Sequence, residues 1–195
     1  PDRQAALSVG AGDLNKDGFT DFYLPGYGEA HWKISDGRGS FRRASSFDPG
    51  TAGILAEAYA AQMADFDNDG ILDVVELDKD WLRIRDYRPA ADGSSVWGLG
   101  GGERTDTDTR AFALGDLNGD GSVDLLTIKT SGAMLVLKNE GARKNFVALN
   151  LVGRTSNRSA IGAKAEIRSG SLTQKLEVYA SSPAPAATGL TFGLG

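Results

Sequence analysis

The chain has 195 residues, of which 41% are hydrophobic and 24% are charged, a composition typical of a soluble globular protein with one or two domains. No apolar run is long enough to span a membrane, and the first residues do not resemble a signal peptide. The formal net charge is −5, and the basic residues are scattered without an aromatic and basic stripe, which argues against nucleic-acid binding.

The first predicted elements are two short strands, at 6–9 and 22–24, joined by an acidic loop. Gly18, at position 6 of this nine-residue loop, permits the positive φ that a tight curl requires. Such a curl lets the oxygen atoms of the loop converge on one point. The expected ligands are the side chains at positions 1, 3, 5 and 9 and the carbonyl at position 7, namely Asp13, Asn15, Asp17, Asp21 and Phe19.

The same loop occurs three times, with first positions about 50 residues apart. A repeat at this period places one loop in each of three similar units, as in a propeller, a solenoid or an array. The expected ligands of the second copy are Asp65, Asp67, Asp69, Asp73 and the carbonyl of Ile71. Those of the third copy are Asp116, Asn118, Asp120, Asp124 and the carbonyl of Ser122.

Oxygen ligands of this number predict calcium, since magnesium demands stricter octahedral geometry and zinc prefers His or Cys. The chain has one His and no Cys. Clustered carboxylates are unfavourable at close range without a cation. One copy alone could be an ordinary acidic turn, but three complete copies predict about three structural calcium ions.

The residues beside the loops separate this pattern from an EF-hand. An EF-hand loop continues into a helix and carries a bidentate Glu at position 12. Here position 12 is Leu24, Glu76 and Thr127, and the flanking runs are short and rich in β-forming residues. Each loop therefore links two strands, although Glu76 leaves an EF-like site open for the middle copy.

A strand, the sequence Gly-Asp-Leu-Asn-x-Asp-Gly-x-x-Asp and a second strand resemble the calcium-binding blade of FG-GAP or VCBS-type, integrin-alpha-like β-propellers, over residues 5 to about 145. The resemblance implies four-stranded blades with the calcium loop between the first two strands. We therefore expect an all-β fold with three consecutive four-stranded blades, an incomplete propeller, at 5–50, 56–103 and 108–144.

The remaining strands of these blades follow from alternation and turn residues. The first blade ends in a hairpin of 30–35 and 40–43. The second contains a strand at 80–87, in which Arg83 and Arg85 are expected to point outward, and then a loop and a glycine run at 99–102. The third ends with a strand at 133–138.

From residue 145 the calcium pattern stops. A strand at 146–152 and a hairpin of 163–168 and 172–179, with one apolar and one charged face, predict a separate β-hairpin-rich unit at 145–195. This unit resembles the start of an ASPIC/UnbV domain, the module that follows such blades in bacterial relatives of cartilage acidic protein. The resemblance is carried by 145–147 with Leu151, 156–158 with 161–163, and 190–195.

Three blades cannot close a propeller, which has four to eight. Open strand edges invite pairing, so we expect other protein chains, or further blades of the same protein, to cover them. Loops without a Glu at position 12 should bind calcium weakly and suit the millimolar calcium found outside cells. The sequence thus predicts a calcium-stabilised, extracytoplasmic, non-catalytic protein-binding or scaffold module.

Two other classes of function have less support in the sequence. A carbohydrate-binding module, or an accessory region of a polysaccharide-active secreted protein, would need Trp32, Trp81 and Trp97 to line one exposed groove. An enzyme is disfavoured, because the sequence offers no Cys, no Ser-His-Asp arrangement, no phosphate loop and no carboxylate pair outside the metal loops.

Overall fold

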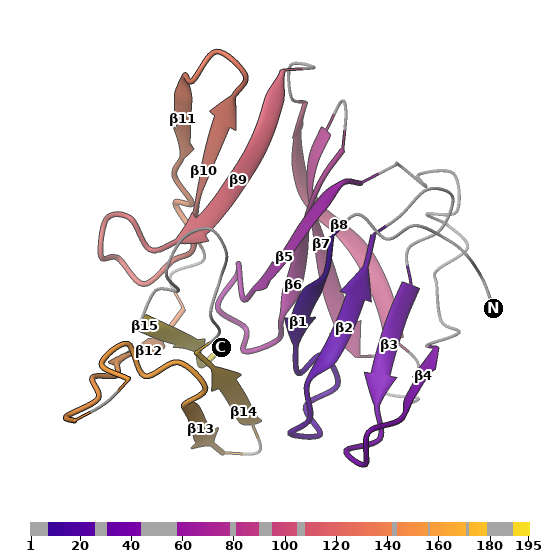
Figure 1. Ribbon diagram of the computed structural model, residues 1–195, viewed down its shortest axis with the longest axis vertical. Helices are drawn as coiled ribbons and strands as arrows, with labels where there is room; N and C mark the ends of the chain where they lie inside the picture. Colours follow the sequence, from indigo (N-terminus) through magenta and orange to yellow (C-terminus); the bar gives the residue numbers. More distant parts are fainter. Residues whose placement is uncertain are drawn as a thin grey trace.

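The computed structural model describes residues 8–25, 31–43, 58–78, 81–89, 95–104, 108–141, 144–155, 157–170, 172–178 and 189–195. Within these ranges the chain forms fifteen strands in five small antiparallel sheets, and no helix (Figure 1). The predicted all-β class is confirmed. The described part also contains no helix that is long and apolar enough to cross a membrane.

The first two blades are four-stranded meanders, in which each strand pairs with the next along the chain. The first consists of β1 (Gly10–Gly12), β2 (Asp21–Leu24), β3 (His31–Ser35) and β4 (Phe41–Arg43). The second consists of β5 (Ala60–Ala64), β6 (Asp73–Leu77), β7 (Trp81–Pro89) and β8 (Ser95–Arg104). The calcium-type loops lie between β1 and β2 and between β5 and β6, as predicted.

The third sheet has three strands in the described residues, where four were expected. They are β9 (Thr109–Gly115), β10 (Asp124–Lys129) and β11 (Met134–Leu137), in the order β11-β10-β9. Residues 138–141, which follow β11, form no strand. The third loop again links the first two strands of its sheet.

The fourth strand of the second blade includes the glycine run at 99–102, which the sequence pattern did not assign to a particular strand. The run is part of β8, where Gly101 and Gly102 pair with Ile84 and Arg83 of β7. A ladder needs only backbone N–H and C=O groups, so residues without side chains can join it when the neighbouring strand is long enough. Of the first strand predicted at 6–9, residues 6 and 7 lie outside the described residues, and residues 8 and 9 precede β1, which begins at Gly10.

The blades stack face to face around two apolar cores. Tyr23 and Trp32 of the first blade pack with Val74 of the second, whereas Val75 packs with Phe112 of the third. Adjacent residues of a strand point to opposite faces, so β6 is buried on both sides. This arrangement is that of partial propeller blades, and the described sheets do not close into a ring.

Burial on both faces overturns the expected orientation of two arginines. Arg83 and Arg85 were expected to point outward, but both are buried, and they pair with the carboxylates of Asp78 and Glu76. They share a face with Val74, because Arg85 pairs with Val74 and Arg83 with Glu76 across the sheet. The first blade packs on that face, so the expected solvent-exposed side does not exist.

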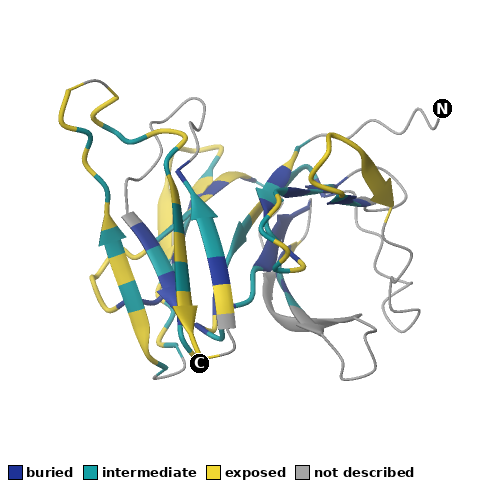
Figure 2. Cartoon of the chain, turned by 90° about the horizontal axis from the view of Figure 1, so that it is seen from below, coloured by how far each residue is buried: buried dark blue, intermediate teal, exposed yellow. Residues whose placement is uncertain are grey.

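The C-terminal unit comprises two strand pairs. β12 (Phe146–Asn150) pairs with β15 (Gly189–Gly193), and β13 (Lys164–Ser169) pairs with β14 (Leu172–Glu177). Their inner side chains form a third core around Val178, Leu190 and Phe192. Figure 1 shows this unit beside the turn that joins β5 and β6, and Figure 2 shows exposed residues gathered on the turns and outer strands.

Candidate metal centre

The three acidic loops share one pattern of hydrogen bonds. In each, the carboxylate at position 1 accepts hydrogen bonds from the amides of positions 5 and 6, at 2.8–3.1 Å. The amide of position 5 also donates to the side-chain oxygen of position 3, at 2.9–3.2 Å. Finally, the carboxylate of position 5 accepts from the amide of position 7, at 2.7–2.9 Å.

The glycine at position 6 is what permits this curl. Gly18, Gly70 and Gly121 have φ values of 86°, 85° and 84°, in the left-handed region that residues with a Cβ rarely occupy. Their amides point to the position-1 carboxylates. The sequence prediction that each loop curls around its own acidic side chains is therefore consistent with the structure at all three copies.

The carboxylate at position 9 ties each loop to the blade. Asp21, Asp73 and Asp124 each accept a hydrogen bond of 3.0 Å from the amide at position 2 of their loop. Asp21 also accepts from the amide of Ser35, the last residue of β3, at 2.8 Å, and Asp124 accepts from the amide of Asn139, shortly after β11, at 2.9 Å. Position 9 therefore has a structural role in addition to its predicted role as a metal ligand.

We expect Asp21→Ala to lower the free energy of unfolding by about 1–3 kcal/mol even in chelator, because the variant leaves the buried amide of Leu14 and the half-buried amide of Ser35 without their acceptor. Urea unfolding followed by circular dichroism measures this. Asp36→Ala is the control, since Asp36 is an exposed turn carboxylate that also accepts two backbone amides. Equal losses in the two variants would contradict the assigned role of Asp21.

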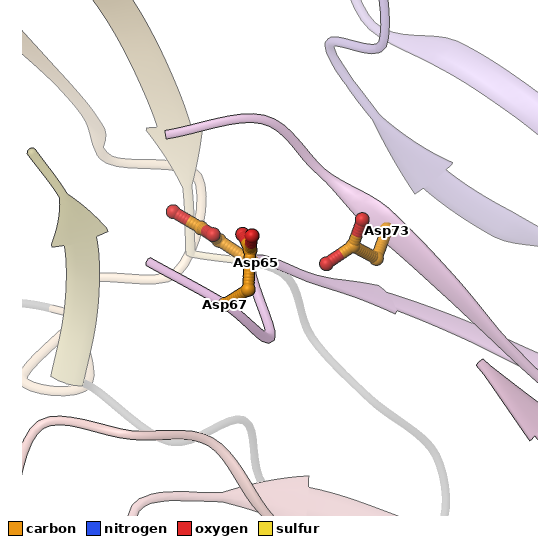
Figure 3. Close-up of side chains that lie close together, drawn as sticks. All are labelled: Asp65, Asp67 and Asp73. Carbon is orange, nitrogen blue, oxygen red and sulfur yellow. The ribbon is translucent and has the colours of Figure 1, made fainter. Parts of the chain in front are cut away.

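The second loop brings three carboxylates together. Oxygen atoms of Asp65, Asp67 and Asp73 lie within 4.8 Å of one another, and such a group could hold a metal ion. Figure 3 shows these three side chains. Asp69 is not in this group, and its Oδ1 accepts the amide of Ile71. The first and third loops have an asparagine at position 3, so they offer an amide oxygen there instead of a third clustered carboxylate.

The electrostatics of these groups favour a bound cation. Burial, reinforced by the charges of neighbouring aspartates, raises the pKa of Asp65 to about 6 and that of Asp73 to about 8. Burial also raises the pKa of Asp13 and Asp21. Ionised carboxylates that are partly removed from water and close together are unfavourable unless a cation compensates them. The oxygen-only donor set fits calcium.

The predicted ligands lie as follows. The side chains at positions 1, 3, 5 and 9 of each loop lie in the hydrogen-bonded curl, and among the described residues the triad of the second loop is the group of carboxylates that could hold a metal ion. The carbonyls of Phe19, Ile71 and Ser122 remain predicted ligands. Glu76 pairs with Arg85 and is buried in β6, so the EF-like alternative for the middle copy is wrong.

Two lysines near the loops were not recognised in the sequence. Lys144 donates from Nζ to Asp67 Oδ2 at 2.9 Å, and the charges of Asp69, Asp65 and Asp13 act on Lys16, whose pKa is lowered by burial. Lys16 occupies position 4 of the first loop, and this position could have suggested that its charge interacts with the loop aspartates. No local signal links Lys144 to a loop 77 residues earlier.

The three loops surround one cavity of about 690 Å³. The aspartates at position 1, Asp13, Asp65 and Asp116, line it together with Lys175 of β14. The inner strands β1, β5 and β9 lie beside one another at this point. The loops of three separate blades therefore face a common space, which the C-terminal unit borders.

Comparison with protein families supports this description for the first part of the chain. Residues 5–76 match the model of an FG-GAP-like repeat, and this range holds the first blade, the second loop and most of β6. The FG-GAP resemblance is thereby confirmed for these residues. No ASPIC/UnbV domain is detected in the C-terminal unit. Comparison with curated proteins finds no similar sequence.

Proposed function

We propose that this chain is a calcium-stabilised, non-catalytic binding or scaffold module that works outside the cytoplasm. The observation that carries this proposal is the loop geometry, which is repeated three times with the same backbone hydrogen bonds. The carboxylate triad of the second loop and the FG-GAP-like repeat support it. We extend the calcium assignment from that triad to all three loops.

Calcium at these loops would be structural. Each loop joins the first two strands of a sheet, and the position-9 carboxylates of Asp21 and Asp124 accept a backbone amide at the end of the third strand or shortly after it. An ion held by such a loop fixes three strands relative to one another. If each site has a dissociation constant of about 10⁻⁴ M, calcium near 1 mM stabilises the fold by about 1.4 kcal/mol per site.

The third sheet presents a face for a partner. Tyr23 and Val75, two residues after position 9 of their loops, are covered by the next blade, but the equivalent Leu126 is only half-buried. Its neighbours on this face, Ile128, Met134 and Val136, are exposed, Met134 to 70%. We propose that a further blade-like sheet, from another protein or from the same one, covers this face.

The carbohydrate-binding alternative is not supported by the tryptophans. Trp32 is 3% exposed and packs on the Tyr23 ring, with centroids 4.1 Å apart, so it belongs to the core between the first two blades. Trp81 is partly exposed beneath Arg83. The side chain of Trp97 lies outside the described residues. An exposed groove of all three tryptophans is therefore wrong.

For the C-terminal unit, the finer family assignment is also a proposal. We propose that residues 145–195 correspond to the start of an ASPIC/UnbV domain, on the sequence resemblance at 145–147 and 190–195. The two matching segments are adjacent in the fold, since β12 pairs with β15. Two segments that belong to one domain are expected to pack together, and this pairing meets that expectation.

Counting bound calcium tests the proposed function. Equilibrium dialysis against 1 mM calcium is expected to give close to three ions per chain, and two for Asp65→Ala or Asp116→Ala. Asp67→Asn is the matched control, because it gives the second loop the asparagine of the other two and should retain three. No bound calcium in the wild type, or an unchanged count in Asp65→Ala, would overturn the assignment.

A further inference from the structure

The C-terminal unit contacts all three loops. Lys175 of β14 donates from Nζ to the carbonyl of Gly18 in the first loop, at 2.7 Å. The ring of Phe146 in β12 lies against Gly121 of the third loop, where a Cβ would overlap the ring. The backbone of β15 lies against the second loop. The unit therefore docks on the metal loops of the blades.

On the C-terminal side, the contact with the second loop is made by backbone amides. The amide of Gly193 donates to Asp65 Oδ2 at 3.2 Å, and the amide of Gly195 donates to the carbonyl of Asn68 at 3.0 Å. Gln174 holds this strand end by donating to the carbonyl of Gly193. A Cβ at Gly193 would overlap both the backbone of Asn68 and the carboxylate of Asp65. Only glycine allows this approach.

The second loop differs from the other two in its partners. Each position-1 carboxylate accepts amides of its own loop, but Asp65 accepts a further amide from 128 residues away. The asparagines at position 3 donate to the position-5 carboxylate of their own loop. Asp67 cannot donate, and its second oxygen instead accepts Lys144, just before β12. Through both differences, the second loop accepts hydrogen bonds from the C-terminal unit and from the residue just before it.

Docking and calcium act on the same carboxylates. With β15 in place, the side chain of Asp65 is 7% exposed, and it lies close to the carboxylates of Asp67 and Asp73. Withdrawing clustered carboxylates from water is unfavourable without a compensating cation. The ammonium of Lys144 compensates one of them, whereas a calcium ion would contact all three. The docked arrangement is therefore more favourable when the loop is filled.

We propose that the second loop is a calcium-dependent joint, in which calcium bound to Asp65, Asp67 and Asp73 favours docking of the β12–β15 unit. By thermodynamic linkage, docking raises the calcium affinity of this loop by the same factor. The inference rests on the proposed calcium function and goes beyond it. It assigns to one of the three ions the task of holding the C-terminal unit on the blades.

Hydrogen exchange on the full chain measures the docking. Calcium is expected to slow exchange of the amides of Gly193 and Gly195 by about tenfold or more, because a coupling of this kind is typically 5–150-fold. Asp69→Ala removes the predicted position-5 ligand of the second loop, whereas the hydrogen bonds described between this loop and the C-terminal strand end are made by Asp65 and Asn68. In this variant calcium should no longer slow these two amides. The corresponding first-loop variant, Asp17→Ala, should leave their calcium response intact.

The reciprocal measurement is calcium affinity. Gly193→Ala, which obstructs the contact with Asn68 and Asp65, is expected to weaken one of the three sites about tenfold and leave two unchanged. Gly115→Ala is the matched control, since Gly115 also ends a strand but has no atom within 4 Å of an added Cβ. Titration calorimetry of the two variants and the wild type gives the comparison.

The outcomes separate this inference from the function on which it rests. If the wild type binds three calcium ions but the amides of Gly193 and Gly195 exchange equally fast with and without calcium, the joint is overturned and the calcium function stands. The same follows if Gly193→Ala binds calcium like Gly115→Ala. If the wild type binds no calcium, the proposed function itself fails.

Discussion

Removing calcium with a chelator is expected to lower the midpoint of thermal unfolding by about 8–16 °C. The estimate follows from about 4 kcal/mol for three sites at 1 mM calcium and from a shift of about 2–4 °C per kcal/mol for a chain of this size. Differential scanning calorimetry in 1 mM calcium and in excess chelator provides the measurement.

The physical reason lies in how the loops are placed. Each one links the first two strands of a sheet, and the empty second loop leaves Asp65 and Asp73 buried next to each other's charge. Without calcium, the loop must either take up protons or open to water. Both responses weaken the attachment of β6, which is buried on both faces and belongs to both inter-blade contacts.

Variants with one disabled loop give the internal control for chelation. Asp116→Ala, which removes the third site, should reduce the difference between calcium and chelator by about a third. Magnesium at the same concentration should restore less stability than calcium, since it demands near-ideal octahedral geometry. Equal unfolding midpoints with and without chelator would contradict a stabilising role for the loops.

The part of this structure that was predictable from sequence is the part encoded locally. Within nine residues, the spacing of Asp13, Asp17, Gly18 and Asp21 specifies the curl, because each hydrogen bond in it spans seven residues or fewer. The repeat of that spacing located the three blades and the strands beside each loop. The triad of the second loop follows from the same pattern.

The features that could not be predicted from the sequence depend on which sheets and loops pack against each other. Arg83 and Arg85 alternate with Leu82 and Ile84 as in a half-buried strand, and only the packing of the first blade on the second shows that the charged face is buried. The contact of Gly193 with Asp65 joins residues 128 positions apart. Such a contact leaves no periodic signal, because the donor is a backbone amide of a glycine far along the chain.

The buried arginines lead to the second prediction with a large effect. Arg85→Met is expected to lower the free energy of unfolding by about 3–5 kcal/mol, because it leaves the carboxylate of Glu76 buried without its partner. Glu76 is 2% exposed, and burial raises its pKa against the opposing charge of Arg85. Urea unfolding at neutral pH measures the change.

The double variant Glu76→Leu/Arg85→Met separates the cost of an unpaired charge from the value of the pair. Replacing a buried ion pair by apolar residues of similar volume is often neutral or stabilising, so the double variant should recover most of the loss. Arg168→Met is the control for an exposed pair, since Arg168 and Glu166 meet at the surface of β13. Its change should stay below about 1 kcal/mol.

Recovery in the double variant would mean that this face of β6 needs no charge for stability, and that burial between two blades is what makes Glu76 and Arg85 depend on each other. A loss in Arg85→Met no larger than that in Arg168→Met would contradict the buried pair. It would also count against the observed packing of the first blade on the second, because that packing removes the Glu76–Arg85 face from water.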